Sequence, residues 1–150
     1  GFAVVTLPAY AEALNSDFRY NLTVIGQFAQ AIVAAKIQDG QFTIQTDQPP
    51  QGGGEGTAPP PFDLFLASIA TCAGIYVKGY CDTRQIPTEN LGIEMRVERD
   101  EEHRVARLVL EIRLPEGFPE KHREGVVRAA DLCSVKKHIF KPPAFEIRAV

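Results

Sequence analysis

The residues of this chain best suited to chemistry are its three cysteines, Cys72, Cys81 and Cys133. A thiol acts as a nucleophile only as the thiolate, and two thiols that meet can form a disulfide. Cys72 lies deep in an apolar run, and Cys133 ends a second apolar pattern. A cysteine in an apolar helix is most often a small core residue, so inert filler is the first interpretation of each.

Cys81 is expected to stand apart from Cys72. The two residues are nine positions apart in a predicted helix, which at about 100° per residue places them about 180° apart around the helix axis. They therefore cannot face the same pocket while the helix lasts. We expect Cys81 to be a bystander.

Other motifs add little chemistry. The sequence has no Cys-x-x-Cys, and His103, His122 and His138 are scattered without metal spacing, so we expect solvated histidines, no metal and no cofactor. The glycine-rich run Gly52–Gly56 lacks the Lys-Ser/Thr of a phosphate loop and favours a flexible loop. A cysteine hydrolase stays open, because Cys-His-acid triads form in space and not in sequence.

The bulk composition predicts one ordinary soluble domain. A chain of 150 residues with 45% hydrophobic and 23% charged residues can bury roughly 70% of the surface that its unfolded form exposes. Its net charge of -3 implies no general attraction to nucleic acid or to anionic membranes. An odd number of cysteines argues against a secreted disulfide scaffold.

The ends and the hydropathy favour a cytoplasmic location. We expect no stretch to reach the roughly 20 apolar residues that span a bilayer. The segment Gly1–Pro8 has no basic flank and is short for a signal peptide. Residues 1–19 are expected to form an N-terminal extension, followed by a single domain over residues 20–150.

The first part of that domain predicts an antiparallel meander. β-Branched and aromatic residues mark three strands, with Asp39-Gly40 as a hairpin turn. The strands are expected at Leu22–Ile25, Ala31–Val33 and Phe42–Ile44. The Gly- and Pro-rich stretch Asp47–Thr57 then predicts a loop.

A long helix is expected from about Phe62 to Tyr80, after three consecutive prolines that end at Pro61. Apolar residues surround most of its circumference, which is typical of a helix enclosed by other structure. We therefore expect it to be the buried central helix of the fold.

The second half predicts two strands, a helix and a final strand. Apolar and polar residues alternate over 91–97 and 106–114, so each strand has one buried face. Pro119 opens a helix whose apolar residues recur with a spacing that points Cys133 inward. A short segment Val135–Phe140 and a last strand, Phe145–Ala149, follow. The order βββ-α-ββ-α-β is an α+β pattern.

Four short motifs, taken together, are similar to those of a known protein family. They are Ile44-x-x-Asp47-x-Pro49, Thr57-x-x-x-Pro61-x-Asp63-Leu64, Cys72, and Cys133-Ser-Val135. With these motifs and its element order, the chain from Tyr20 to Val150 resembles the OsmC/Ohr family of osmotically inducible and organic hydroperoxide resistance proteins. The resemblance implies the OsmC-like fold, with antiparallel sheets around a buried central helix in an intertwined homodimer.

The resemblance also implies a function in oxidative stress defence. In the mechanism that the resemblance implies, the Cys72 thiolate reduces an organic hydroperoxide to its alcohol and becomes a sulfenic acid. Cys133 then reacts with this sulfenic acid to form a disulfide. A dithiol reductant then restores both thiols. The expected protein is therefore a thiol-dependent peroxidase, or peroxiredoxin-like oxidoreductase.

Two departures from the family pattern point to its less characterised OsmC-like branch. The family's peroxidases resemble one another in an Arg after the first strand and a Glu after the helix-starting proline. Here the loop reads Gly26-Gln-Phe-Ala29, and Phe62 follows the proline. Asp63 is then the candidate supporting acid, and Arg19 and Lys36 are candidate cations for Cys72. The alternative is a dimer that binds a small hydrophobic ligand and keeps its cysteines as inert core residues.

Overall fold

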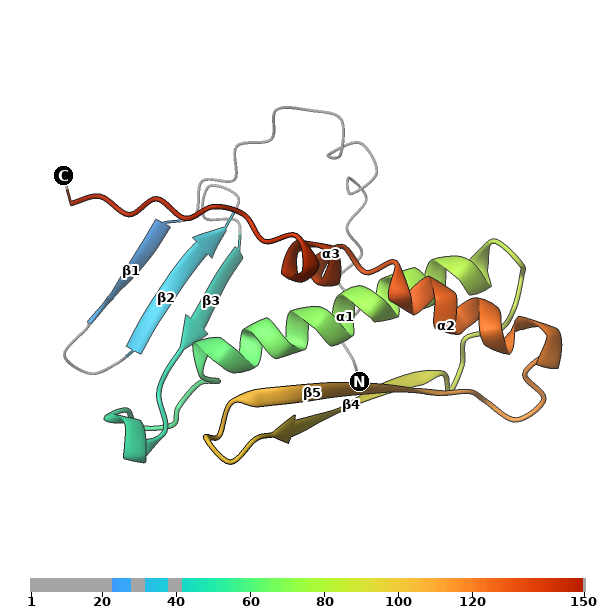
Figure 1. Cartoon of the computed structure of the whole chain (residues 1–150), viewed down its shortest axis with the longest axis horizontal. Helices are drawn as coiled ribbons and strands as arrows, with labels where there is room; N and C mark the ends of the chain where they lie inside the picture. The colour runs from blue at the N-terminus through green and yellow to red at the C-terminus, as the bar shows by residue number, and fades with distance from the viewer. Residues whose placement is uncertain (1–22, 28–31, 38–41, 150) are drawn as a thin grey trace. The chain divides into compact units, whose positions relative to one another are not determined.

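The computed structural model describes residues 23–27, 32–37 and 42–149. The chain divides into two compact units, residues 1–61 and 62–150, and Figure 1 shows their elements. Strands and helices both occur, so the predicted α+β class is confirmed. The division into an extension of residues 1–19 and one domain of residues 20–150 stays a prediction.

The first unit contains a three-stranded antiparallel sheet in the order β1-β2-β3. Its strands are β1 (Thr23–Gln27), β2 (Ile32–Ile37) and β3 (Phe42–Thr46). The pairing of Gly26 with Val33 and of Ala35 with Ile44 fixes the register. The predicted meander is confirmed. The proposed turn at Asp39-Gly40 lies outside the described residues.

The loop after β3 is organised around one buried carboxylate, that of Asp47. Its Oδ1 accepts a hydrogen bond from the Gln48 amide at 2.7 Å. Its Oδ2 accepts three more, from the amides of Glu55 and Thr57 and from the Thr57 hydroxyl, at 2.9 to 3.2 Å. These bonds, above all the one from the Thr57 amide, lower the pKa of Asp47 against the opposing effect of burial.

The same loop is wound too tightly for a side chain at Gly54. A Cβ there would lie 2.0 Å from the Gln48 carbonyl oxygen and 2.4 Å from Asp47 Oδ1, well inside van der Waals contact. A short 3-10 helix, η3 (Pro50–Gly52), forms part of the loop. The glycines therefore serve a compact turn around a carboxylate. The predicted loop is confirmed, and its hydrogen-bonded organisation around Asp47 was not predicted.

The second unit is built on the long helix α1 (Pro61–Asp82), close to the predicted bounds. Proline suits the first helical position because its missing N–H would have no partner there, and Asp63 complements the positive end of the helix dipole. Gln85, in the left-handed region with φ of 55°, and then Pro87 prevent the helix from continuing.

One face of α1 is buried, and that face is the centre of the core. Leu66, Ile69, Ala73, Val77 and Cys81 are its buried residues, at the spacing of one helical stripe. On other faces Phe65 and Ile75 are 42% and 61% exposed. The predicted core helix is confirmed, with one buried face and exposed apolar residues on other faces of the single chain.

The prediction that no segment is long and apolar enough to span a bilayer was wrong for helix α1. Among the described residues it alone is long and apolar enough for that by length and composition. The core helix of a soluble protein passes the same test, and this helix packs its buried face against other elements of its own unit. The hydrophobicity of α1 is therefore not by itself evidence for a membrane span.

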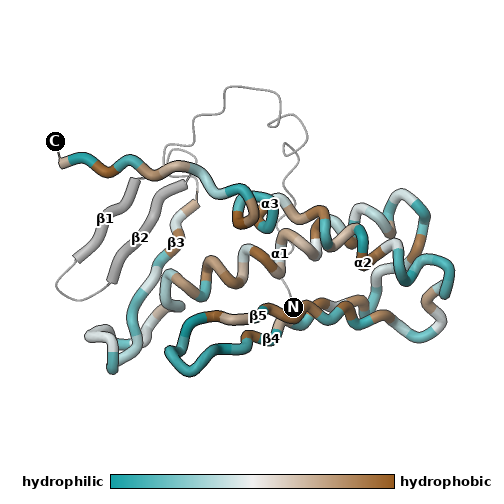
Figure 2. The backbone as a smooth tube through the Cα atoms, in the orientation of Figure 1, coloured by the Kyte–Doolittle hydropathy of each residue, from teal (hydrophilic) through white to brown (hydrophobic). Residues whose placement is uncertain are grey.

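Strands β4 (Gly92–Arg99) and β5 (Val105–Arg113) form an antiparallel hairpin that lies along α1 (Figure 1). The pairs Ile93 with Ile112 and Met95 with Leu110 place the apolar residues of both strands on one face. Figure 2 shows this apolar stretch of the hairpin beside the helix, and a hydrophilic turn at its end. The predicted alternation is confirmed.

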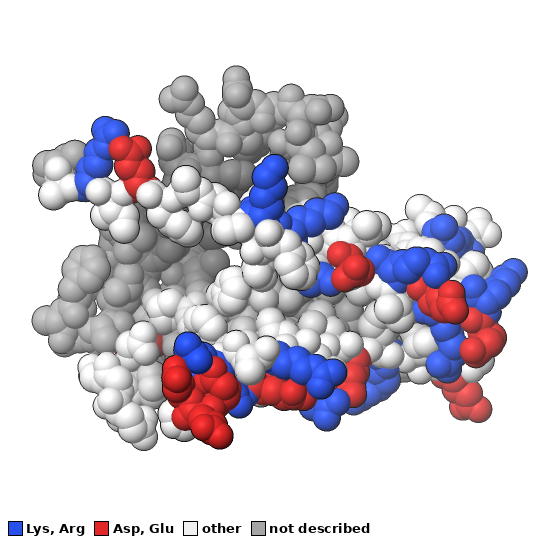
Figure 3. All heavy atoms as spheres, viewed as in Figure 1, with Lys and Arg blue, Asp and Glu red and all other residues white. Residues whose placement is uncertain are grey.

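The other face of the hairpin is charged, with both signs interleaved (Figure 3). Cross-strand ion pairs join Arg96 to Glu111 at 2.7 Å and Arg107 to Glu98 at 3.7 Å, and Arg113 also pairs with Glu94. Because these side chains are more than half exposed, each pair contributes little to stability. They do keep the outer face of the hairpin polar.

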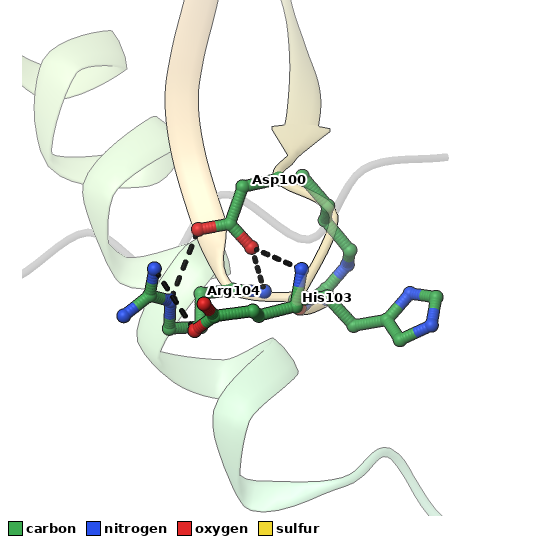
Figure 4. Close-up of polar contacts among 5 residues, drawn as sticks. Asp100, His103 and Arg104 are labelled. Carbon is green, nitrogen blue, oxygen red and sulfur yellow. Dashed lines mark hydrogen bonds and ion pairs between the residues drawn. The ribbon is translucent and has the colours of Figure 1, made fainter.

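The turn between β4 and β5 is held by Asp100 (Figure 4). Its carboxylate accepts bonds from the amides of Glu102 and Arg104 and from Arg104 Nε, at 2.9 to 3.0 Å. His103 occupies the left-handed region with φ of 60°, and its ring points away from this cluster. The arrangement is that of a structural turn.

Two shorter helices, α2 (Arg123–Asp131) and α3 (Ser134–Phe140), follow the 3-10 helix η4 (Glu120–His122). Helix α2 lies beside the C-terminal part of α1 (Figure 1). Gly125 allows this approach, because a Cβ there would lie 1.9 Å from the Tyr80 hydroxyl. A core cluster joins the helices to the hairpin; its buried members are Ala73, Val77, Cys81, Ile86, Phe118, Val126 and Ala130.

The predicted last strand, Phe145–Ala149, is not formed in the described chain. Residues 144–149 have no regular secondary structure, and Phe145 and Ile147 are 85% and 93% exposed. A strand needs a neighbouring strand to bond with, and alternation alone does not supply one. The sequence pattern was therefore insufficient here.

Candidate redox site

The structure brings Cys72 and Cys133 together, although 61 positions separate them in sequence. The neighbouring Cys72 thiol raises the pKa of Cys133, and both thiols are free. Cys133 Sγ also lies 3.8 Å from the Ile69 carbonyl oxygen, one turn before Cys72. Cys133 is fully buried, whereas Cys72 is partly exposed.

The junction between α2 and α3 positions Cys133. Its amide donates to the Ala130 carbonyl at 3.4 Å, at the end of α2, and its own carbonyl accepts from the Lys137 amide at 3.2 Å within α3. Cys133 is thus the residue that caps α3 at its N-terminus. Val126, Ala129 and Ala130 are buried with it, which confirms the inward direction that their spacing predicted.

Opposing effects act on the Cys133 thiol. Burial, the largest effect, raises its pKa above the ordinary value, and the neighbouring Cys72 raises it further. Hydrogen bonds from the backbone amides of Lys136 and Val135 lower the pKa, because they favour the thiolate. The Cys133 sulfur is therefore buried away from solvent and also accepts hydrogen bonds from backbone amides.

A hydrogen bond that the sequence did not predict lies next to this pair. The hydroxyls of Tyr76 and Ser134 are 2.8 Å apart. Tyr76 is four residues after Cys72 on α1, and Ser134 directly follows Cys133. The spacing of Tyr76 from Cys72 was the available signal, since residues i and i+4 share a helix face.

Cys81 is buried in the core at the far end of α1. Burial, followed by the charge of Asp82, raises the pKa of its thiol, while Arg84 and Lys78 act in the opposite direction. It belongs to the same cluster as Ala73 and Val77. The structure gives it the surroundings expected of a bystander.

The candidate supporting residues are not gathered at this pair within the second unit. Asp63 is exposed in the first turn of α1, and its nine-residue separation from Cys72 places it about 180° away around the helix. Lys36 belongs to β2 in the other unit, and Arg19 lies outside the described residues. Their roles stay predictions.

The hydrogen bonds of His122 and His138 join them to residues other than the cysteines. His122 Nδ1 lies 3.0 Å from the Tyr80 hydroxyl, and His138 Nδ1 lies 2.8 Å from the Ser134 carbonyl oxygen, so it donates there. His103 is exposed in the hairpin turn. In the part of the chain that the structure describes, no group of three or more His, Cys, Asp or Glu residues is arranged to hold a metal.

A separate cavity of about 660 Å³ lies in the second unit. Its lining is mixed. Apolar side chains such as Leu110, Ile112 and Val126 are joined by the charged Arg123, Glu124, Arg128, Asp131 and Lys136. Neither Cys72 nor Cys133 is among its lining residues. The volume is in the usual range for small-molecule sites, but it is not the site of the thiol pair.

Comparison with known proteins gives the family. Residues 53–148 match the family described as OsmC-like protein, and because this match covers more than half of the chain, the chain belongs to that family. The comparison with curated protein sequences returned no match.

Solved structures agree with this assignment. A Psychrobacter arcticus 273-4 protein, provisionally named an osmotic stress induced and detoxification response protein, is 21% identical with a TM-score of 0.69, over 82% of this chain and 90% of its own. The organic hydroperoxide resistance protein OsmC of Legionella pneumophila, also named a predicted redox protein, is 20% identical with a TM-score of 0.55, over 83% and 91% of the two chains. The organic hydroperoxide resistance protein of Elizabethkingia anophelis is 16% identical with a TM-score of 0.53, over 83% and 90%. At these identities the likeness establishes a shared fold.

Proposed function

We propose that this protein is a thiol-dependent peroxidase that reduces organic hydroperoxides through Cys72 and Cys133, as part of oxidative stress defence in the cytoplasm. The observation that carries the proposal is that Cys133 lies against α1 beside Cys72. Its Sγ is 3.8 Å from the Ile69 carbonyl oxygen, one turn before Cys72, although 61 positions of sequence separate the two cysteines. Family membership and relatives named as organic hydroperoxide resistance proteins support the substrate class.

The difference in exposure supports the proposed division of roles. A peroxide can reach the partly exposed Cys72 directly, whereas Cys133 is fully buried. In the first step the Cys72 sulfur attacks the terminal oxygen of ROOH. The O–O bond breaks, the alkoxide takes the thiol proton and leaves as ROH, and Cys72 becomes the sulfenic acid.

In the second step the Cys133 thiolate attacks the Cys72 sulfur. The S–S bond forms, the S–O bond breaks, and the hydroxide leaves as water after taking up the Cys133 proton. Burial raises the pKa of Cys133, and the amides of Lys136 and Val135 oppose that rise, so these amides favour the thiolate needed for this attack. A dithiol reductant, itself oxidised to a disulfide, then returns both cysteines to thiols.

The proposal includes a homodimer. Large apolar side chains on α1 are exposed in the single chain, including Phe62 and Phe65, whose ring centroids are 5.5 Å apart. Phe145 and Ile147, on the C-terminal segment, are also exposed. Apolar residues at this density favour burial against another subunit. Sedimentation velocity at micromolar concentration is expected to give twice the 16.5 kDa chain mass, and a monomer would contradict this part.

Peroxide consumption tests the proposed activity. With cumene hydroperoxide and dihydrolipoamide as the dithiol, the wild-type protein should turn over many equivalents. Cys72→Ser should lower the rate at least about a hundredfold, because the attacking atom is lost. Cys81→Ala is the matched control and should stay within about twofold of wild type. Equal rates for the wild-type and Cys72→Ser proteins would contradict the proposal.

A second function, a dimer that binds a small hydrophobic ligand, is favoured by the cavity between β5 and α2. It predicts that an apolar fluorescent probe binds with the same affinity before and after Cys72→Ser, and that peroxide leaves all three thiols intact. Disulfide formation with peroxide would argue against inert cysteines.

A further inference from the structure

A side-chain hydrogen bond between two hydroxyls ties the two cysteine-bearing segments together beside the thiols. The Tyr76 and Ser134 hydroxyls are 2.8 Å apart, and both residues are partly buried. Tyr76 is one helical turn beyond Cys72, so both lie on one side of α1. Ser134 is the first residue of α3, directly after Cys133.

Helix α3 has few other ties to the rest of the unit. It has seven residues, none of them buried. Its other side-chain hydrogen bonds are local, from Lys136 to Asp131 and from His138 to the Ser134 carbonyl. In the described part of the chain, the Tyr76–Ser134 bond is the side-chain hydrogen bond that joins α1 to α3.

This bond and the Cys133 contact with the Ile69 carbonyl flank the thiol pair along α1. Ile69 precedes Cys72 by three residues and Tyr76 follows it by four, so the start of α3 is fixed to α1 on both sides of Cys72. A short helix without buried residues would otherwise open readily. Opening would carry Cys133, and the amides that act on its sulfur, away from Cys72.

We propose that Tyr76 is a positioning residue for the second chemical step: through Ser134 it holds Cys133 against Cys72, so that the disulfide forms within the chain. This inference rests on the proposed peroxidase function. Tyr76 takes no part in the attack on the peroxide, so the first step does not depend on it. Its effect is confined to how often the two sulfurs are within reach of each other.

The test separates the two steps. Reduced wild-type and Tyr76→Phe proteins are mixed with cumene hydroperoxide. Cys72 sulfenic acid is trapped with dimedone, and the Cys72–Cys133 disulfide is counted by mass spectrometry after rapid quenching. Sulfenic acid should form at the wild-type rate, and the disulfide about three- to tenfold more slowly, the range expected for one hydrogen bond. Ser134→Ala should have the same effect.

Tyr80→Phe is the matched control, because Tyr80 is a turn further along α1 and bonds to His122 instead. It removes one tyrosine hydroxyl from the same helix and should change neither step. The proposal is overturned if Tyr76→Phe changes neither step, slows both steps equally, or has no larger effect than Tyr80→Phe.

A second measurement does not depend on peroxide. If the wild-type protein formed no sulfenic acid, the proposed function would fail, yet Tyr76 can still be tested in a glutathione redox buffer. Tyr76→Phe should then lower the effective concentration of the thiol pair about three- to tenfold, with Tyr80→Phe unchanged. An unchanged equilibrium for Tyr76→Phe would overturn the positioning role on its own.

Discussion

The two buried cysteines, Cys81 and Cys133, have equal exposure and different surroundings. Both side chains are fully buried, and burial raises the pKa of both thiols. Around Cys81 are core residues of α1 and its neighbours, with the charge of Asp82 adding to the effect of burial. Around Cys133 are a second thiol and two backbone amides that favour the thiolate.

The difference shows that two equally buried thiols can have very different surroundings. What separates them is whether a partner and hydrogen-bond donors reach the sulfur. Asp47 follows the same rule in the other unit. It is as deeply buried as either thiol, but four donors meet its carboxylate, and they lower its pKa.

The largest expected contrast is in alkylation of the native, reduced protein. With iodoacetamide at pH 8, Cys72 should react first because it is partly exposed. Cys133 should follow by local opening of α3, and Cys81 should react about a hundredfold or more slowly than Cys72, because its exposure requires opening of the core. Peptide mapping by mass spectrometry against time gives the three rates. Equal alkylation rates at Cys81 and Cys133 would contradict the expectation that Cys133 is exposed by local opening and Cys81 only by opening of the core.

Serine substitution should distinguish the two buried sites by stability. Cys81→Ser places a hydroxyl in an apolar core and should lower the free energy of unfolding by about 1 to 3 kcal/mol. Cys133→Ser should cost less than about 1 kcal/mol, because the amides of Val135 and Lys136 can donate to the hydroxyl oxygen. Urea unfolding under reducing conditions measures both. A larger loss at Cys133 would show that the donors do not compensate there.

A pH-dependent effect is expected at Asp47. Asp47→Asn keeps one acceptor oxygen, so the urea midpoint at pH 7 should fall by about 0.5 M. The folded-state pKa of Asp47 is lowered, so its contribution is complete above the unfolded value of about 3.9 and is lost as the pH falls through the folded value. Midpoints measured from pH 7 down to pH 2.5 should therefore converge for the two proteins. A constant difference across this range would contradict the role of the ionised carboxylate.

Much of the fold was predictable from local patterns. The alternation in β4 and β5 and the long apolar helix α1 gave correct elements, because a period of two or 3.6 directly reflects one buried face. The spacing of Val126, Ala129 and Ala130 also gave the inward direction of Cys133. These features depend on residues within a few positions of one another.

The parts that failed or were missed depend on distant residues. The strand expected at Phe145–Ala149 needs a neighbouring edge that a period of two does not supply. The Asp47 bonds reach across up to ten positions and the Tyr76–Ser134 bond across 58, and neither has a local sequence pattern. The approach of Cys72 to Cys133 was likewise implied by the family resemblance and not by the residues.

The most direct test of the account is to locate the disulfide. The reduced protein is treated with one equivalent of cumene hydroperoxide, and its peptides are mapped by mass spectrometry without further reduction. We expect rapid loss of two thiols, a Cys72–Cys133 link and an intact Cys81 thiol. Three persistent thiols, or a link that includes Cys81, would contradict this expectation.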